Sequence, residues 1–190
     1  MKISKRIMAL LMAALLVFGL PLSFFASDGG EIRIATAADW KSFVKICKLD
    51  TWSVGKTVVL DTDLDLGGNF TPVPVFSGTF DGNGHSIHMG SYTSAASDTG
   101  VFRYVSEGAV VKNLTVTGTW EPSGGKSAIG GIVGHNSGTI ENCMFNGVVD
   151  GKNNIGGIAG INENTGVITG CTVRGEIRGE HPANGTSCDN

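Results

Sequence analysis

The sequence predicts an all-β fold, a right-handed parallel β-helix with one short N-terminal capping helix, preceded by a signal peptide. Three observations lead to this fold class. The 190 residues include 29 glycines but only 5 prolines, a balance that favours many tight turns over disorder. Short β-prone stretches alternate with glycine and asparagine along most of the chain. A glycine-rich block also recurs with a period in the high twenties, which is typical of stacked solenoid coils.

Residues 1–27 have the composition of a secretory signal peptide. Lys2, Lys5 and Arg6 precede an apolar run over residues 7–25, which is followed by small residues. An uncleaved membrane anchor is the alternative, because the run is nearly long enough to span a bilayer. We therefore expect a secreted or cell-surface protein that contacts the membrane only through this segment.

Residues 28–56 are expected to hold a short strand and the capping helix. The alternating stretch 31–35 predicts the strand. Thr36 precedes Asp39 by three residues, a spacing typical of a helix start, and a helix is expected over 37–49. Its apolar positions fall at i, i+3, i+4 and i+7: Trp40, Phe43, Val44 and Cys47. A helix before a long β region would cover the raw strand edges and apolar core at one end.

Residues 57–179 are expected to form the β-helix itself, with its clearest repeats at 129–151 and 155–179. The first eight-residue block of one repeat, 129–136, recurs as 155–162, an offset of 26. Later positions match at an offset of 28, and a degenerate copy begins near 108 at an offset of 29. This period leaves no room for a helix and is too short for a propeller blade, so stacked β coils are the simplest solution.

Stacking at this period places equivalent residues of successive coils in contact. Two apolar ladders are expected inside: Val111, Ile140 and Ile168 in one, and Leu114, Cys143 and Cys171 in the other. Opposite charges are expected beside each other outside: Lys112 with Glu141, and Asp150 with Arg178. Cysteines within an apolar ladder favour buried free thiols over disulfides.

The repeats resemble a known family. Gly131-Ile132-Val133-Gly134 and its copy at 157–160 are similar to the GLUG motif, with isoleucine at the leucine position of the motif. The upstream block 76–87 is similar to the segment that often precedes such repeats, so the resemblance extends from about 32 to 179. It implies a bacterial secreted or surface-attached protein with a β-helix-like region, sometimes joined to a peptidase or adhesive module. The motif brings no catalytic residue with it.

Length and charge narrow the possible partners. The length suits a single domain. A net charge of −3, with 14 lysines and arginines and no basic run beyond the N-terminus, excludes an electrostatic footprint for nucleic acid. Carbohydrate or a host or cell-surface protein remain as candidate partners.

One candidate metal site stands out. Asp61, Asp63 and Asp65 alternate along a predicted strand, and three carboxylates on one side are a weak candidate for binding Ca²⁺. The stretch is not an EF-hand loop, because Gly67 and Pro72 occupy its seventh and twelfth positions. The alternative is an exposed polar face opposite the apolar side chains of the same stretch.

Catalysis has little support in the sequence. His85 follows the tight turn 81–84, but no nucleophile or second carboxylate accompanies it. The leading hypothesis is thus a non-catalytic secreted or cell-surface repeat module for adhesion, display or spacing. The alternative is a carbohydrate-active β-helix enzyme of the polysaccharide lyase or hydrolase type, which requires Asp61, Asp63, Asp65 and His85 to share one cleft. A further interpretation takes the chain as the N-terminal part of a larger protein.

The segment 180–190 is polar and without apolar periodicity, so it does not predict a second capping helix. We expect the last coil to present an open edge and a partly exposed core. An uncapped coil favours end-to-end self-association, further coils in a longer protein, or marginal stability.

Overall fold

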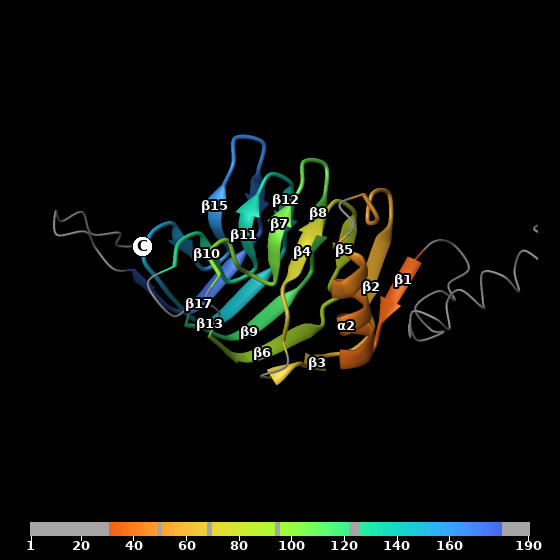
Figure 1. The fold of residues 1–190 in the computed structure, drawn as a ribbon, viewed down its shortest axis with the longest axis horizontal. Helices are drawn as coiled ribbons and strands as arrows, with labels where there is room; N and C mark the ends of the chain where they lie inside the picture. The colour runs from red at the N-terminus through yellow and green to blue at the C-terminus, as the bar shows by residue number, and fades with distance from the viewer. Residues whose placement is uncertain (1–30, 49–50, 68–69, 94–95, 122–125, 180–190) are drawn as a thin grey trace, which may run out of the picture.

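The computed structural model describes residues 31–48, 51–67, 70–93, 96–121 and 126–179. These residues wind into a β-solenoid of about five turns with one short helix, as predicted (Figure 1). Every strand pairing in this part of the chain is parallel. The expected signal peptide, the polar segment 180–190 and Cys188 lie outside the described residues. No helix in the described ranges is long and apolar enough to cross a membrane.

The solenoid has three main faces, which we call A, B and C. Face A stacks β1 (Glu31–Ile34), β2 (Thr57–Leu60), β5 (Thr79–Asp81), β8 (Val110–Lys112), β12 (Thr139–Glu141) and β16 (Val167–Thr169). Face B stacks β3 (Leu64–Asp65), β6 (Ser86–Tyr92), β9 (Thr115–Trp120), β13 (Met144–Gly151) and β17 (Thr172–Gly179). Face C stacks β4 (Val73–Phe76), β7 (Phe102–Val105), β11 (Val133–Asn136) and β15 (Ala159–Asn162). The short strands β10 (Ile129–Gly130) and β14 (Ile155–Gly156) pair with each other.

The strand registers confirm the repeat alignment. Val133 pairs with Ala159 on face C, the predicted offset of 26. Ile140 pairs with Ile168 on face A at an offset of 28, and with Val111 on its other side at an offset of 29. The period of the sequence is therefore the period of the coil.

Apolar ladders fill the space between the faces. On face A, Val58, Phe80, Val111 and Ile140 are each fully buried and each pairs with the next. The second predicted ladder is also present, because Leu114 and Cys143 are buried and Cys171 packs against the core from the last turn. The three described cysteines are free thiols, as expected for Cys143 and Cys171, although Cys171 is only partly buried.

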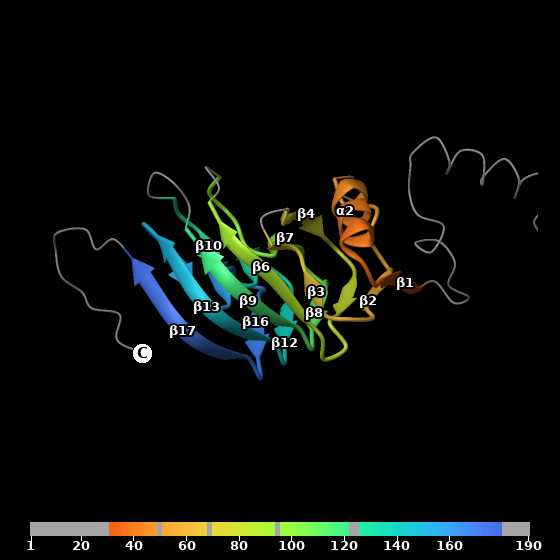
Figure 2. The same cartoon turned by 90° about the horizontal axis from the view of Figure 1, so that it is seen from below.

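The helix α2 (Ala37–Ile46) covers the core at the N-terminal end of the solenoid (Figures 1 and 2). It begins with the predicted capping box: Thr36 accepts a hydrogen bond from the Asp39 backbone N–H, and the Asp39 carboxylate accepts one from the Thr36 N–H. It ends at Ile46 rather than near residue 49. Trp40 and Phe43 are buried against the aromatic rings of the first turns, which confirms the capping role.

The alternation of Asp61, Asp63 and Asp65 predicted one strand, but the structure divides this stretch between two strands. β2 ends at Leu60 and β3 starts at Leu64, because the chain turns there from face A to face B. Leu60 and Leu64 still point into the core, so the apolar pattern was correct although the corner was missed.

The outer charges follow the predicted register but form different ion pairs. Lys112 lies beside Glu141, and Asp150 beside Arg178, in paired strands. The Lys112 ammonium instead contacts the Asp81 carboxylate of the preceding turn at 3.4 Å. Arg178 contacts Glu176 of its own strand at 2.7 Å.

Candidate functional site

The structure places the predicted aspartates in separate surroundings. Asp61 forms an ion pair with Arg33 of β1. Asp63 accepts a hydrogen bond from the Ser86 backbone N–H at 2.7 Å, whereas Asp65 is exposed on β3. No three His, Cys, Asp or Glu side chains within the described ranges form a group that could hold a metal ion. Calcium binding by Asp61, Asp63 and Asp65 thus stays a prediction, with no preformed cluster in its favour.

His85 and Asp63 do lie together, at 3.4 Å. The Ser86 backbone N–H, with a smaller contribution from His85, lowers the pKa of Asp63. The neighbouring corner is structural: Asp81 accepts hydrogen bonds from Asn83 and Asn113 and so fastens two successive turns. Although burial opposes its ionisation, these bonds and Lys112 hold the pKa of Asp81 below its ordinary value.

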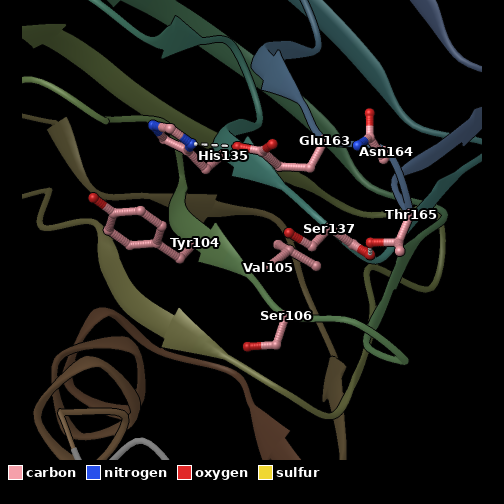
Figure 3. A pocket seen from close by; sticks show the side chains of 8 residues that line it. All are labelled: Tyr104, Val105, Ser106, His135, Ser137, Glu163, Asn164 and Thr165. Carbon is pink, nitrogen blue, oxygen red and sulfur yellow. Dashed lines mark hydrogen bonds and ion pairs between the residues drawn. The ribbon is translucent and has the colours of Figure 1, made fainter.

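A different place, on the outside of face C, gathers more varied side chains. It is an open groove of about 480 Å³ where the strands of three turns pass into the corner toward face A. Figure 3 shows its eight lining residues: Tyr104, Val105, Ser106, His135, Ser137, Glu163, Asn164 and Thr165. We call it the face C groove.

One wall of the face C groove is a pair of stacked rings. Tyr104 on β7 and His135 on β11 are neighbours in the strand register. Their ring centroids lie 5.2 Å apart with 27° between the planes. Burial and the nearby Asp98 carboxylate raise the pKa of Tyr104. The wall therefore offers an aromatic surface and a hydroxyl group.

His135 is held between two carboxylates. Its Nε2 lies 2.9 Å from Asp98 Oδ1, and its Nδ1 lies 3.2 Å from Glu163 Oε1. Asp98 has a left-handed backbone conformation, with φ of 57°, and Glu163 follows β15 on the next turn. Both ring nitrogens are thus engaged, which fixes the plane of the imidazole against Tyr104.

Hydroxyl groups line the opposite side. Ser106 and Ser137 occupy equivalent corners of successive turns, and the Ser106 Oγ accepts a hydrogen bond from the Ser77 Oγ at 2.9 Å. Thr165 of the last turn donates to the Ser137 carbonyl at 2.9 Å. The groove thus presents aromatic, hydroxyl, amide and carboxylate groups across three turns.

Sequence reasoning missed the face C groove, although one signal was present. Tyr104, His135 and Ile161 share one register position on three successive strands, and their side chains lie on the outer surface. The change of residue type at this outer position could have drawn attention to this part of face C. The partners Asp98 and Glu163 lie in turns and had no such signal.

The motif glycines have a packing role. A Cβ at Gly131 would lie 2.4 Å from the Phe145 ring, and one at Gly157 would lie 2.4 Å from the Val173 side chain. These glycines bring the backbone directly onto the side chains of face B, so any larger residue would force the coil apart.

Comparisons with known proteins agree with this architecture. The family model described as the GLUG motif matches residues 125–150 and 151–178. Halomucin of Haloquadratum walsbyi (strain DSM 16790 / HBSQ001) is 28% identical over 140 residues, which cover 70% of this chain and 2% of halomucin. The chain thus spans about one fiftieth of the length of that relative. No solved structure matches it. The chain carries two GLUG repeats, and they form the last two turns of its solenoid.

Proposed function

We propose that this chain is a non-catalytic, exported repeat module for adhesion at a surface, and that the face C groove is its contact site for carbohydrate. The observation that carries the proposal is the groove itself, with the Tyr104–His135 stack on one side and hydroxyl groups on the other. The similarity to halomucin and the GLUG repeats support a repeat protein of this type.

The chemistry of the groove suits a sugar chain. Sugars have apolar C–H faces that pack on aromatic rings and hydroxyl groups that both donate and accept hydrogen bonds. Tyr104 is 36% exposed, so part of its ring is available for such packing. Ser106, Ser137 and Asn164 supply polar groups that exchange hydrogen bonds with hydroxyls without carrying a charge. An open groove that crosses several turns favours an extended polymer over a small enclosed ligand.

The geometry gives His135 a positioning role toward Tyr104. Both of its ring nitrogens already contact carboxylates, so the imidazole acts as a support that orients the tyrosine ring. Replacement of His135 is therefore expected to weaken binding less than replacement of Tyr104.

Binding of the secreted chain to a panel of immobilised polysaccharides tests the proposal. Tyr104→Ala should weaken the strongest interaction about tenfold, because the packing surface is lost. His135→Ala should weaken it less. His88→Ala is the matched control, since His88 is an exposed histidine on face B that contacts Thr117.

Two results would overturn the proposal. Equal binding by the wild type, Tyr104→Ala and His88→Ala proteins would remove the groove from the interaction. Release of new reducing ends or unsaturated sugar products, abolished by His135→Ala, would replace adhesion with the enzymatic alternative.

Protease treatment of intact cells tests the location, and a chain protected from the protease until lysis would contradict export.

A further inference from the structure

The last turn of the solenoid exposes its inner apolar positions. Ile168, Val173 and Ile177 are 39%, 42% and 40% exposed. Their partners one turn earlier are fully buried: Ile140, Phe145 and Val149 respectively. The last turn therefore continues the core ladders to a surface that no described residue covers completely.

The same turn presents unpaired strand edges. β15, β16 and β17 are the terminal strands of faces C, A and B, so among the described strands each has a neighbour on one side only. β17 is the longest of them, with eight residues, and Figure 2 shows it running along the end of the molecule opposite α2. Edges of this kind pair readily with another strand.

The opposite end of the solenoid does not complement this edge. There, Trp40 and Phe43 of α2 cover the core, so the described part of the first turn offers no open apolar layer to a second copy. Head-to-tail stacking is thus obstructed by the helix. Among the described residues, β1 also ends its sheet at that end, but the open apolar layer of the last turn has no counterpart there.

The outer charges of β17 alternate in sign along the strand: Arg174, Glu176 and Arg178, of which Glu176 contacts Arg178 at 2.7 Å. Arg174 and Glu176 lie on its outer side, in register with Asn146 and Val148 of β13, and flank Gly175. In an antiparallel pair of β17 strands centred on Gly175, Arg174 faces the partner subunit's Glu176, and Val173 faces the partner subunit's Ile177. Opposite charges and apolar side chains are both favourable cross-strand neighbours.

We propose that two copies of this chain associate through their last turns, about a two-fold axis, with β17 pairing antiparallel across that axis. The association buries the exposed inner side chains of the last turn, Ile168, Val173 and Ile177, and pairs the strand edge of face B. Because the contact is the same on both copies, it closes after two and builds no fibre. This interaction does not depend on the face C groove.

Sedimentation velocity of the full secreted chain over a range of concentrations tests the proposal. The wild type should show a monomer–dimer equilibrium with no larger species. Ile177→Lys should raise the dissociation constant at least about tenfold, because a charge enters the buried strip. Val54→Lys is the matched control: Val54 is 58% exposed in the loop before β2, and its replacement should leave the dimer intact.

Reversing the charges of Glu176 and Arg174 in two separate variants distinguishes loss of strand pairing from misfolding. Glu176→Arg and Arg174→Glu should each weaken self-association, since like charges then face each other across the axis. An equimolar mixture of the two variants should restore a one-to-one dimer, which only correctly folded partners can form.

Other outcomes would overturn the proposal. These are a wild type that stays monomeric at every concentration, a series of oligomers larger than the dimer, and a dimer that persists in Ile177→Lys. A monomer that dimerises only after deletion of residues 180–190 would assign the edge to that segment instead.

Discussion

The two ends of the solenoid are built from the same kind of coil but finish differently. At the N-terminal end, α2 places Trp40 and Phe43 over the first turns, and both side chains are buried. At the other end, Ile168 and Ile177 occupy inner positions yet remain well exposed. Burial in this fold is thus a property of the neighbouring turn as much as of the residue. Matched substitutions on the inner turns and on the last turn should lower the free energy of unfolding by different amounts.

The largest effect is expected at the capped end. Trp40→Ala removes a buried ring that packs on Phe80 and whose Nε1 donates to the Thr71 carbonyl. The free energy of unfolding should fall by about 4 kcal/mol, from the lost burial and the cavity that remains. Urea denaturation followed by circular dichroism measures it. A loss below about 1 kcal/mol would mean that the helix does not stabilise the solenoid end.

Ile140 and Ile168 provide the sharpest comparison, since they are the same residue in register on adjacent turns. Ile140→Ala should cost about 3 kcal/mol, because the side chain is fully buried. Ile168→Ala should cost about 1 kcal/mol or less, since that side chain is 39% exposed. Both are measured by denaturation at low protein concentration. Equal losses would contradict an open last turn.

The stacked side-chain amides of Asn136 and Asn162 should give a smaller difference in the free energy of unfolding. The Asn136 side chain is buried, donates to Asn162 Oδ1 at 2.8 Å and accepts from the Gly138 N–H at 3.2 Å. Asn136→Ala leaves those groups without a partner and should cost about 2 kcal/mol. Asn162→Ala, on the exposed last turn, should cost about 0.5 kcal/mol. If the order of the two losses is reversed, the amide ladder does not act through burial.

The cysteines should differ in reactivity in the same way. Burial raises the pKa of the Cys143 thiol from 9.0 to about 12, whereas Cys171 lies only partly buried on the last turn. At pH 8, iodoacetamide should modify Cys171 at least about tenfold faster than Cys143, as mass spectrometry of peptides would show. Equal rates would place Cys143 nearer to solvent than its ladder position allows.

The raised pKa of Cys143 also has a consequence for stability. As the pH rises from 9.0 toward 12, the unfolded chain loses the thiol proton while the folded chain keeps it. The free energy of unfolding should therefore fall over this range. Cys143→Ala should show a shallower fall than the wild type in denaturation at pH 8 and pH 10. Parallel curves for the two proteins would contradict the burial of the thiol.

The repeat made most of the architecture predictable. The matches of Ile129 with Ile155 and of Ile140 with Ile168 became strand registers directly, because stacked coils pair equivalent residues. The capping box at Thr36 was equally predictable from the sequence, since it depends only on the spacing between Thr36 and Asp39. The corner between Leu60 and Leu64 could not be predicted from the sequence, because the residues on either side of it keep a strand-like alternation.

Side-chain partners and the face C groove were harder to predict. Lys112 reaches Asp81 on the preceding turn rather than Glu141 on the following one, a choice between two neighbours that the register allows equally. The groove combines Tyr104, His135 and Glu163 from three turns, where the sequence departs from its own repeat. Tyr104 and His135 share one position of the repeat, but Asp98 and Glu163 lie in turns outside the strand register, so only the assembled coil brings these groups together.

Hydrogen exchange with mass spectrometry tests the difference between the two ends most directly. The chain would be measured at a concentration low enough to keep it monomeric. Amides of β16 and β17 should exchange at least about tenfold faster than those of β8 and β9. Those of β2, which pairs with β1 and β5 near the capped end, should stay as protected as the inner turns. Protection of the last turn equal to that of β8 and β9 would contradict an open C-terminal end.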